Sequence, residues 1–244
     1  MSYNGQLISV IVPAYNAGDK LRDTCTKIVE YLINESMRYE IIIVDDGSSD
    51  DTAGILNELS SQDCSIRFLT NSGNMGKGYS VRRGVLESRG DYVFFTDADL
   101  STPIHELQKL ISCLGQGYDI AIASRALSDS NVIVHQHFCR EHSGKLFNLI
   151  MRSVLFLDIK DTQCGFKCFK RAAALDVFGR QTINGFCFDA EVLYVAKKKG
   201  YKTKEVPVSW INSESSAVDL FGDGLRMFFD LIRIRINDWR GLYS

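Results

Sequence analysis

Two carboxylates separated by a single residue follow an apolar run in the stretch VFFTDADLSTP, residues 93–103. Burial favours the apolar run, whereas Asp97 and Asp99 would lose hydration and repel each other if they followed it inside. Residues two apart on an extended segment point the same way, so both carboxylates can face one ligand. A divalent cation bound to a diphosphate would remove the repulsion, and carboxylate oxygens suit Mg²⁺ or Mn²⁺. Capping of turns is the alternative for an isolated Asp-x-Asp pair.

Two further segments have residue types suited to the same ligand. Asp45 and Asp46 follow the apolar run EIIIV, and the glycine-rich segment NSGNMGKGYS (71–80) precedes a helical pattern. Ligands of open parallel sheets bind beyond the carboxyl ends of the strands, so a second acidic strand end favours binding over capping. Backbone N–H groups of the glycine-rich segment can approach a phosphate. The segment matches neither a P-loop nor G-x-G-x-x-G, and a tight loop without ligand is the alternative.

These segments must be positioned by elements in which apolar runs alternate with amphipathic ones. Strands are expected over residues 7–13, 39–47, 65–70, 91–99, 118–125 and 203–210, and helices over 19–33, 51–59, 78–88, 103–114, 143–155 and 188–200. Strand runs without polar alternation, separated by helices, predict an α/β fold with a doubly wound, mostly parallel sheet and helices on both faces. No linker or repeat interrupts the pattern, so a single domain over residues 1–244 is expected.

The composition excludes several classes of protein. The chain is 45% hydrophobic and 24% charged with a net charge of -2, which is typical of a soluble globular protein and argues against a nucleic-acid partner. It has no apolar stretch near the ~20 residues of a membrane span and no signal peptide pattern. Seven scattered cysteines suit reduced thiols, so a cytoplasmic protein is expected, in which peripheral contact with the membrane face is open.

Together the motifs resemble family 2 glycosyltransferases, which have the GT-A fold. The matching stretches are ISVIVPAYNAGDKL, IIIVDDGSSDDT, NMGKGYSVRRG and FFTDADLSTP. The later DTQCGFKCFKR, FCFDAEVLYVAKKKGY and EVPVSW are similar to polyprenyl- and dolichyl-phosphate sugar synthases, most of all the dolichyl-phosphate β-glucosyltransferase type. The resemblance implies an inverting, metal-dependent hexosyltransferase that uses a nucleoside-diphosphate sugar, expected to be UDP-glucose, and a polyprenyl or dolichyl phosphate acceptor. It divides the chain into a nucleotide- and metal-binding half (6–125), an acceptor half (126–211) and a C-terminal amphipathic helix (212–244).

The resemblance also implies a role for individual residues of the donor site. Asp99 is the expected main ligand of Mg²⁺ or Mn²⁺, and Asp97 is expected at the ribose, the metal or its bound water. Asp45 is expected to accept from the base, and Asp46 to order the DDGSSDD turn. Ser101 stands where several relatives have Gln, which leaves a third protein ligand open. The full set of expected donor contacts is Pro13, Ala14, Tyr15, Asn16, Asp45, Asp46, Lys77, Asp97, Gln163 and Lys167.

For the acceptor phosphate, the resemblance points to Arg125, Arg140 and Ser143. The guanidinium fork suits a phosphate, although solvated surface arginines are the alternative. Asp161 is expected with Gln163 at the sugar. Asp189 and Glu191 fall where relatives have acids, but a helical spacing of two makes them diverge, so at most one faces the site. A phosphate acceptor is largely dianionic at neutral pH, which makes Asp189 an optional base.

Two segments leave alternatives open. Leu225, Phe228, Phe229, Ile232, Ile236 and Trp239 share one helical face, with Arg226, Arg233 and Arg240 opposite and Arg235 beside them. Residues 219–240 therefore predict either peripheral contact with an anionic bilayer or packing of the apolar face onto the domain. His135, His137, Cys139 and His142 are zinc-type ligands, but no second ligand pair follows, so zinc is not favoured. Ala217 stands where close relatives often have lysine, which leaves the mode of acceptor binding open.

Other functions share the same donor site. A GDP-mannose-dependent polyprenyl-phosphate mannosyltransferase and a family 2 transferase with a soluble acceptor differ only in base, sugar or acceptor. A non-catalytic nucleotide-sugar-binding protein would bind UDP without turnover. Self-association is left open by the sequence.

Overall fold

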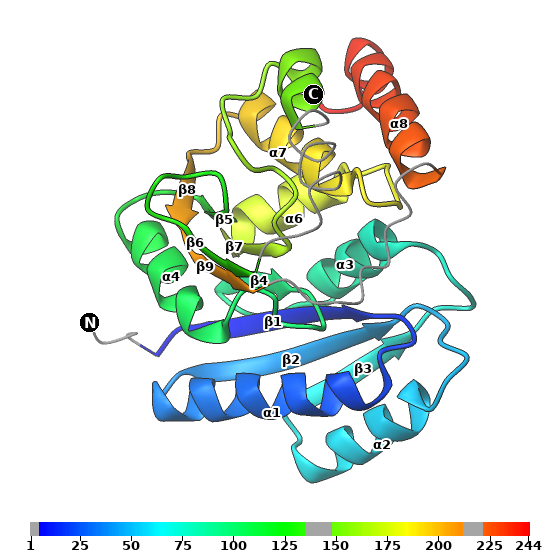
Figure 1. Cartoon of the computed structure of the whole chain (residues 1–244), viewed down its shortest axis with the longest axis vertical. Coiled ribbons are helices and arrows are strands. Elements are labelled where there is room, and N and C mark those ends of the chain that lie inside the picture. The colour runs from blue at the N-terminus through cyan, green and yellow to red at the C-terminus, as the bar shows by residue number, and fades with distance from the viewer. Residues whose placement is uncertain (1–4, 135–147, 212–221) are drawn as a thin grey trace.

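The computed structural model describes residues 5–134, 148–211 and 222–244 and contains one large and one small sheet (Figure 1). The large sheet has the strand order β3-β2-β1-β4-β7-β5-β8, and β6 pairs with β9 in the small one. The strands are β1 (Leu7–Ala14), β2 (Arg38–Asp45), β3 (Ile66–Thr70), β4 (Tyr92–Thr96), β5 (Ile120–Ser124), β6 (Asn131–Val134), β7 (Phe166–Lys170), β8 (Thr203–Pro207) and β9 (Ser209–Ile211).

The helices lie close to their predicted positions, except α6, which was not predicted. They are α1 (Gly18–Asn34), α2 (Thr52–Gln62), α3 (Lys77–Leu86), the 3₁₀ turn η1 (Ile104–Glu106), α4 (Leu107–Gly115), α6 (Arg171–Gly179), α7 (Phe188–Lys198) and α8 (Gly222–Trp239). Residues 148–155 are helical as well, within the segment expected to be a helix over 143–155.

The large sheet is mostly parallel, which confirms the predicted α/β fold class. β1 pairs in parallel with β2 and β4, β2 with β3, and β5 with β8. β7 is the exception, because it runs antiparallel to both β4 and β5. Phe166, the first residue of β7, therefore pairs with Thr96, the last residue of β4. The loop that precedes β7 is thereby brought to the carboxyl end of β4.

Alternate side chains of the strands fill two cores, one on each face of the sheet. Val10 and Val12 of β1 pack with α1, α2 and α4, whereas Ile11 packs with α3, α6, α7 and α8. This period of two explains why both faces are covered by helices and why the strands have no polar alternation.

The predicted strand over 203–210 is divided between the two sheets. β8 ends at Pro207, and Val208 then accepts a hydrogen bond from the backbone N–H of Asn131. The backbone N–H of Ile211, on β9, donates to the carbonyl of Ser101 at 2.8 Å, which ties β9 to the loop after β4. The chain therefore leaves the large sheet in order to support that loop.

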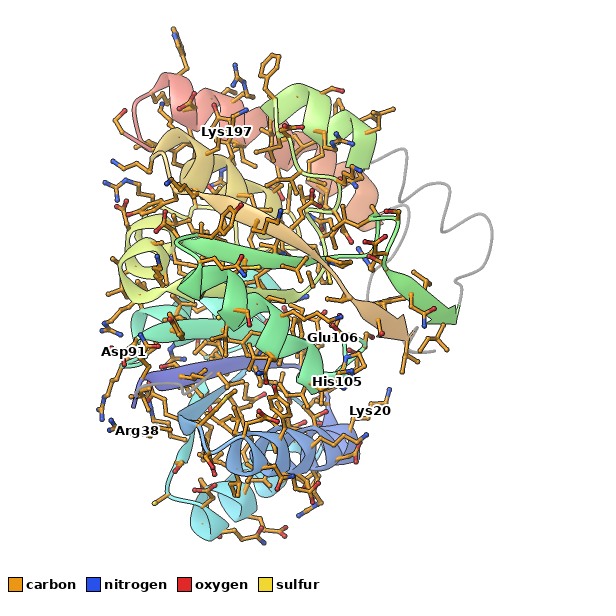
Figure 2. The ribbon with its side chains drawn as sticks, turned by 90° about the vertical axis from the view of Figure 1, so that its left-hand side faces the viewer. Lys20, Arg38, Asp91, His105, Glu106 and Lys197 are labelled. Carbon is orange, nitrogen blue, oxygen red and sulfur yellow. The ribbon has the colours of Figure 1, made fainter. Side chains whose placement is uncertain are left out.

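The two ends of the parallel strands lie on opposite sides of the molecule (Figure 2). Arg38 and Asp91, at the amino ends of β2 and β4, lie on one side, and Lys20, His105 and Glu106, which follow β1 and β4, lie on the other. We call the second side the carboxyl edge. Asp45 and Asp97, at the ends of two strands that flank β1, lie there together.

Helix α8 packs on the molecule with a face that the sequence pattern did not single out. Met227, Leu231 and Ile234 are buried, whereas the six apolar residues of the predicted face are exposed, with Trp239 at 89%. The alternative in which that apolar face packs onto the domain is therefore wrong. In the three described ranges, no helix is both long and apolar enough to span a membrane.

Candidate active site

The loops after β1 and β2 are joined by hydrogen bonds between their side chains and backbones. Asn16 has a φ of +47°, a left-handed conformation that asparagine tolerates better than most residues. Its N–H donates to Ser48 Oγ at 2.9 Å, and its side-chain oxygen accepts the N–H of Ser49 at 2.8 Å. Tyr15 lies on the same loop and is half exposed. The two loops thus form one unit with an aromatic ring at its surface.

Asp45 and Asp46 are both buried, and each orders a different loop. Asp45 Oδ1 accepts the backbone N–H of Ser48 at 3.0 Å and its hydroxyl at 2.6 Å, so Asp45 orders the DDGSSDD turn. Asp46 accepts the backbone N–H groups of Met75 and Gly76 at 2.9 and 2.8 Å. The expectation that Asp46 orders its own turn is therefore wrong, because adjacent residues of an extended chain point to opposite sides.

The glycine-rich loop packs directly against the turn after β2. Gly47 has a φ of +73°, and a Cβ added to it would lie 2.6 Å from Gly73 Cα, so only glycine fits this contact. The N–H groups of Met75 and Gly76 are already bound to Asp46. These two groups hold the loop against β2, and the contact of Lys77, where α3 begins, with the donor stays a prediction.

Lys77 forms an ion pair with Asp97. Its Nζ lies 2.5 Å from Asp97 Oδ1, and its side chain is 22% exposed. Burial alone would lower the pKa of Lys77. The carboxylates of Asp97, Asp189 and Asp99 outweigh that effect and raise the pKa of Lys77, so the ammonium stays charged. One cation therefore lies among three carboxylates at the carboxyl edge.

The turn that carries Asp97 and Asp99 is tightly constrained. The N–H of Asp97 donates to Gly165 O at 3.2 Å, and a Cβ added at Gly165 would lie 2.2 Å from Asp97 Oδ2. Leu100 has a φ of +46°, and its N–H donates back to Asp97 O at 3.2 Å. Asp99 Oδ1 accepts the N–H of Ser101 at 3.0 Å. Backbone contacts thus help to fix the positions of both carboxylates.

Asp97 and Asp99 fit a cation that is shared with a phosphate ligand. Both supply hard oxygen donors, and a carboxylate that accepts one N–H keeps lone pairs for a metal. Within the parts of the chain that the structure describes, no three His, Cys, Asp or Glu side chains are grouped as metal ligands. The chemistry of this pair therefore suits Mg²⁺ or Mn²⁺ completed by diphosphate oxygens or water.

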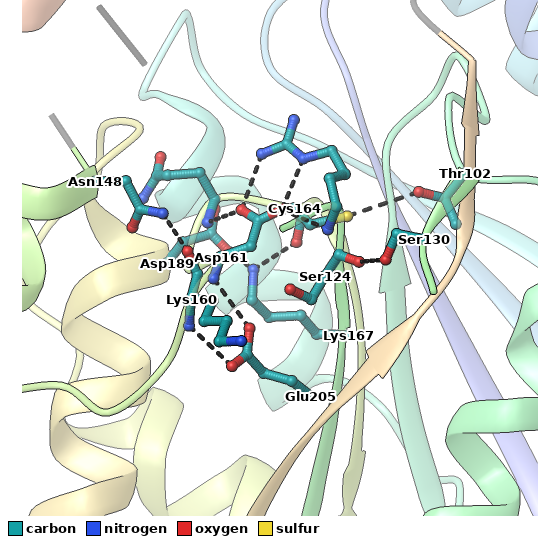
Figure 3. Close-up of polar contacts among 12 residues, drawn as sticks. Thr102, Ser124, Ser130, Asn148, Lys160, Asp161, Cys164, Lys167, Asp189 and Glu205 are labelled. Atoms are coloured by element: carbon teal, nitrogen blue, oxygen red, sulfur yellow. Dashed lines mark hydrogen bonds and ion pairs between the residues drawn. The ribbon is translucent and has the colours of Figure 1, made fainter. Parts of the chain in front are cut away.

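Lys167 and Asp189 form a second ion pair beneath the edge (Figure 3). Lys167 is fully buried, its ammonium donates to Asp189 Oδ1 and to Cys164 O, and it lies 5.3 Å from the centre of the Phe95 ring. Burial raises the pKa of Asp189 and outweighs the opposing effects of Lys167 and Lys77. Asp189 thus lies next to the charged cluster, and its catalytic role stays a prediction. The direct contact of Lys167 with the donor stays a prediction.

Arg125 pairs with Asp161 through both arms of its guanidinium. Nε and Nη2 of Arg125 donate to the two carboxylate oxygens of Asp161 at 2.7 and 2.9 Å. The Asp161 carboxyl is nearly buried, yet Arg125 holds its pKa below the ordinary value despite the burial. Glu205 accepts the N–H of Asp161 at 3.0 Å, and the Arg125 guanidinium lies 5.3 Å from the Trp210 ring. This network fixes the loop before β7 (Figure 3).

The remaining predicted residues are placed as follows. Gln163 lies on the same loop, with Nε2 3.9 Å from the Met151 sulfur. The prediction that Asp189 and Glu191 diverge is confirmed, because Glu191 turns away to accept the N–H groups of Thr182 and Ile183. Arg140, Ser143, the His135, His137, Cys139 and His142 group, and Ala217 lie outside the described residues.

Three contributors to the site were not predicted. Gly165 packs on Asp97, Glu205 holds the Asp161 loop, and the Tyr243 hydroxyl donates to Glu191 at 2.5 Å. The last two contacts join residues 44 and 52 positions apart. No local pattern marks such partners, so they could not be predicted from the sequence.

The sequence comparison agrees with this geometry, because the family described as "Glycosyl transferase family 2" matches residues 9–178 of this chain. The chain belongs to glycosyl transferase family 2. The match spans the loops of this transferase from β1 to the end of α6, including Asp45, Asp97, Asp99 and Lys167.

Curated relatives cover almost all of this family 2 transferase. The dolichyl-phosphate beta-glucosyltransferase of Dictyostelium discoideum is 35% identical over 97% of this chain and 76% of its own length. Those of Saccharomyces cerevisiae and Homo sapiens are each 32% identical over 97% of this chain, and over 76% and 77% of their own lengths.

Solved structures share the fold. Glucosyl-3-phosphoglycerate synthase from Mycobacterium tuberculosis in complex with Mn²⁺, UDP-glucose and phosphoglyceric acid has a TM-score of 0.67 at 18% identity, over 96% of this chain and 80% of its own. Mannosyl-3-phosphoglycerate synthase from Rubrobacter xylanophilus has a TM-score of 0.68 at 19% identity, over 98% and 75%. The GT-A-like fold of this transferase is thereby confirmed.

Proposed function

We propose that this chain transfers glucose, with inversion at C1, from UDP-glucose to a polyprenyl or dolichyl phosphate. The observation that carries the proposal is the 35% identity over 97% of the chain to a dolichyl-phosphate beta-glucosyltransferase. The carboxyl edge adds the chemistry, because it combines two acidic strand ends, an exposed aromatic ring and a paired lysine. The cysteines in the described residues are free and mostly buried, which suits action from the cytoplasmic side.

The donor is bound by the joined loops after β1 and β2. Tyr15 offers its half-exposed ring to the base, while Asn16 and Asp45 hold the loops in register beside it. Pro13 and Ala14 end β1, and Ala14 O accepts the N–H of Asp46 at 2.8 Å, which sets the backbone under the nucleotide. Asp99 and Asp97 would hold Mg²⁺ or Mn²⁺, which when bound stabilises the charge on the departing diphosphate. Lys77 adds a positive charge at the same place.

The reaction needs no proton to be removed from the acceptor. An oxygen of the acceptor phosphate forms a bond to C1 of glucose, and the bond from C1 to the diphosphate oxygen breaks, so that UDP leaves with the electron pair. The α-linked donor gives a β-linked product. The acceptor phosphate is largely dianionic at neutral pH because its second pKa is about 6. Asp189 then acts by holding Lys167, and Arg125 is the described residue proposed to contact the acceptor phosphate.

The test offers the purified full-length chain two donors and two acceptors in the presence of Mn²⁺ or Mg²⁺. We expect glucosyl phospholipid from UDP-glucose and a short-chain polyprenyl phosphate, detected by mass spectrometry, with the β configuration established by NMR. Preference for GDP-mannose would show that the proposed donor is wrong, and transfer to 3-phosphoglycerate alone would show that the proposed acceptor is wrong. UDP binding without any transfer or hydrolysis would refute the enzyme and leave a nucleotide-sugar-binding protein.

A further inference from the structure

Helix α8 presents an apolar face to solvent. Its inward side buries Met227, Leu231 and Ile234, spaced by four and three residues. The outward side has Phe229 at 61% and Trp239 at 89% exposure. Its exposed apolar residues are Leu225, Phe228, Phe229, Ile232, Ile236 and Trp239. Soluble proteins rarely expose contiguous patches of this kind without a partner.

The exposed patch continues beyond the helix. Leu242, Phe156 and Leu149 are each more than half exposed. The Arg235 guanidinium lies 5.4 Å from the centre of the Phe156 ring, which joins α8 to the turn that follows helical residues 148–155. In Figure 1 these two segments lie at the same end of the molecule, away from α1 and α2. We call these nine apolar residues the α8 surface.

The exposed charged side chains in the described part of α8 and at Arg240 are all basic. The expectation that Arg226, Arg233 and Arg240 lie opposite the apolar face is wrong, because their seven-residue spacing places them along one border of it, where all three are exposed. The carboxylates of the described α8 side chains lie toward the protein instead. Asp230 is half-buried, and Asp238 accepts from Tyr194 at 2.6 Å and pairs with Lys198. An apolar face bordered by arginines is complementary to an anionic lipid surface.

We propose that the α8 surface lies on an anionic lipid bilayer, with the helix axis in the membrane plane. The apolar side chains enter the interface, Trp239 sits at headgroup level, and the arginines contact lipid phosphates. An antiparallel two-fold pair of chains joined by this face would bring the same arginine rows together, which disfavours that arrangement of a second copy. The inference goes beyond the proposed function, because it concerns the bilayer and needs neither donor nor acceptor.

The test is flotation of the full chain with vesicles of phosphatidylcholine alone or of phosphatidylcholine with one-third phosphatidylglycerol. We expect binding to the anionic vesicles and a bound fraction that falls at high salt. The chain has two tryptophans, and Trp210 is buried, so a blue shift of the emission on vesicle addition reports Trp239. The shift should be absent in Trp239→Phe.

Two paired comparisons separate this surface from general stickiness. Phe229→Ser/Trp239→Ser should lower the vesicle partition constant at least about tenfold, because two large apolar groups are lost from the interface. Ile33→Ser/Leu86→Ser, at exposed apolar sites on α1 and α3, should leave it unchanged. Arg226→Gln/Arg233→Gln should abolish the preference for anionic vesicles, whereas Arg38→Gln/Arg89→Gln should not.

The outcomes divide cleanly. Absence of flotation by the wild-type chain, or equal flotation of the Phe229→Ser/Trp239→Ser variant with an unchanged melting temperature, would overturn the proposal. Concentration-dependent dimers that this variant abolishes, without vesicle binding, would assign the surface to a second copy and overturn it too. Glucosyl transfer is not a readout here, so the proposed function can fail while vesicle binding stands, and the reverse.

Discussion

Three acid–base pairs surround the carboxyl edge, and each fixes a carboxylate by a different basic residue. Lys77 pairs with Asp97, Lys167 with Asp189, and Arg125 with Asp161. Asp99 instead accepts a backbone N–H from Ser101. Among the four aspartates, Asp99 is therefore the one that a bound cation can approach without displacing a lysine or arginine in the described ranges.

The first prediction concerns Asp99. Asp99→Asn removes the negative charge but keeps the side-chain shape, so we expect kcat/KM to fall at least about a hundredfold because a proposed metal ligand is lost. The melting temperature should stay within about 2 °C, since Asp99 lies on an exposed turn. Steady-state assays at saturating Mn²⁺ check this. The exposed Asp23→Asn on α1 is the control, and normal turnover by Asp99→Asn would contradict the metal role.

Removing the charge of Lys77 should change the binding affinities for the cation and for the nucleotide in opposite directions. Without its charge beside Asp97, Lys77→Gln should bind Mn²⁺ several-fold more tightly in the absence of nucleotide, because a repulsive charge is removed. The same variant should bind UDP about tenfold more weakly. Mn²⁺ titration by electron paramagnetic resonance and UDP titration by calorimetry measure the two constants, with Lys27→Gln as control. A parallel loss of both affinities would show that Lys77 acts only through folding.

Asp161 gives a pH dependence with a definite sign. Because Arg125 lowers its pKa in the folded chain, ionised Asp161 stabilises the fold above its ordinary pKa of about 4, and that contribution is lost as the pH falls through the lower folded pKa. Asp161→Asn should thus cost about 2 kcal/mol of unfolding free energy at pH 7, and the gap should close below pH ~4. Urea unfolding at several pH values measures it. Asp158→Asn on the same loop is the control, and a gap independent of pH would exclude the ion pair as its cause.

At the scale of elements, α7 and α8 are fastened together at a buried carboxylate. Glu191 on α7 accepts the N–H groups of Thr182 and Ile183 and the Tyr243 hydroxyl, which follows α8. Asn237 on α8 donates to Thr182 Oγ1 at 2.9 Å. Asp189 lies two residues before Glu191, so the packing of α8 and the position of Asp189 depend on the same cluster.

Tyr243→Phe tests this cluster. Loss of the hydroxyl leaves a buried carboxylate with one donor fewer, and we expect the unfolding free energy to fall by about 1–2 kcal/mol. Denaturant unfolding checks it, with Tyr118→Phe as a matched change at a half-buried tyrosine beside Lys204. Equal stability of the Tyr243→Phe variant and the wild-type chain would show that the hydroxyl is dispensable.

The sequence predicted elements well where one local period decides them. The parallel strands from β1 to β5 and the helices between them follow from apolar runs and amphipathic spacing. β7 was not predicted as a strand, and its antiparallel pairing with β4 depends on partners about 70 residues away. The inward face of α8 was missed for a related reason, since two apolar stripes compete on it and the sequence favours the larger one.

At the scale of the whole molecule, residues 7–124 and 166–207 contribute strands to one sheet. The sequence motifs brought Asp45, Asp97 and Asp99 together correctly, because strand ends are a topological rule. The motifs did not reveal that Lys167 and Arg125 face carboxylates, because those pairings form between segments that meet only in the folded chain.

A ligand that binds the whole folded molecule should raise its melting temperature. At a hundredfold excess over Kd, UDP with Mn²⁺ should contribute about 2.7 kcal/mol, or about 5–10 °C for a chain of this size. GDP should give a smaller shift under the same conditions. Differential scanning fluorimetry compares them, and a larger shift with GDP would favour the mannosyl alternative.

The turn that carries Asp97 and Asp99 requires glycine at position 165, because even an added Cβ would clash with Asp97. The Asp97 carboxylate occupies the space that a side chain at Gly165 would take, so a single added methyl group would push against both oxygens of the carboxylate that pairs with Lys77. The loop before β7, the strand antiparallel to β4, thus determines the shape of the turn after β4. Substitutions in the loops that carry Gly165 and Asp97 are therefore tolerated only when both loops change together. A screen that varies one loop at a time would find no tolerated substitution in either.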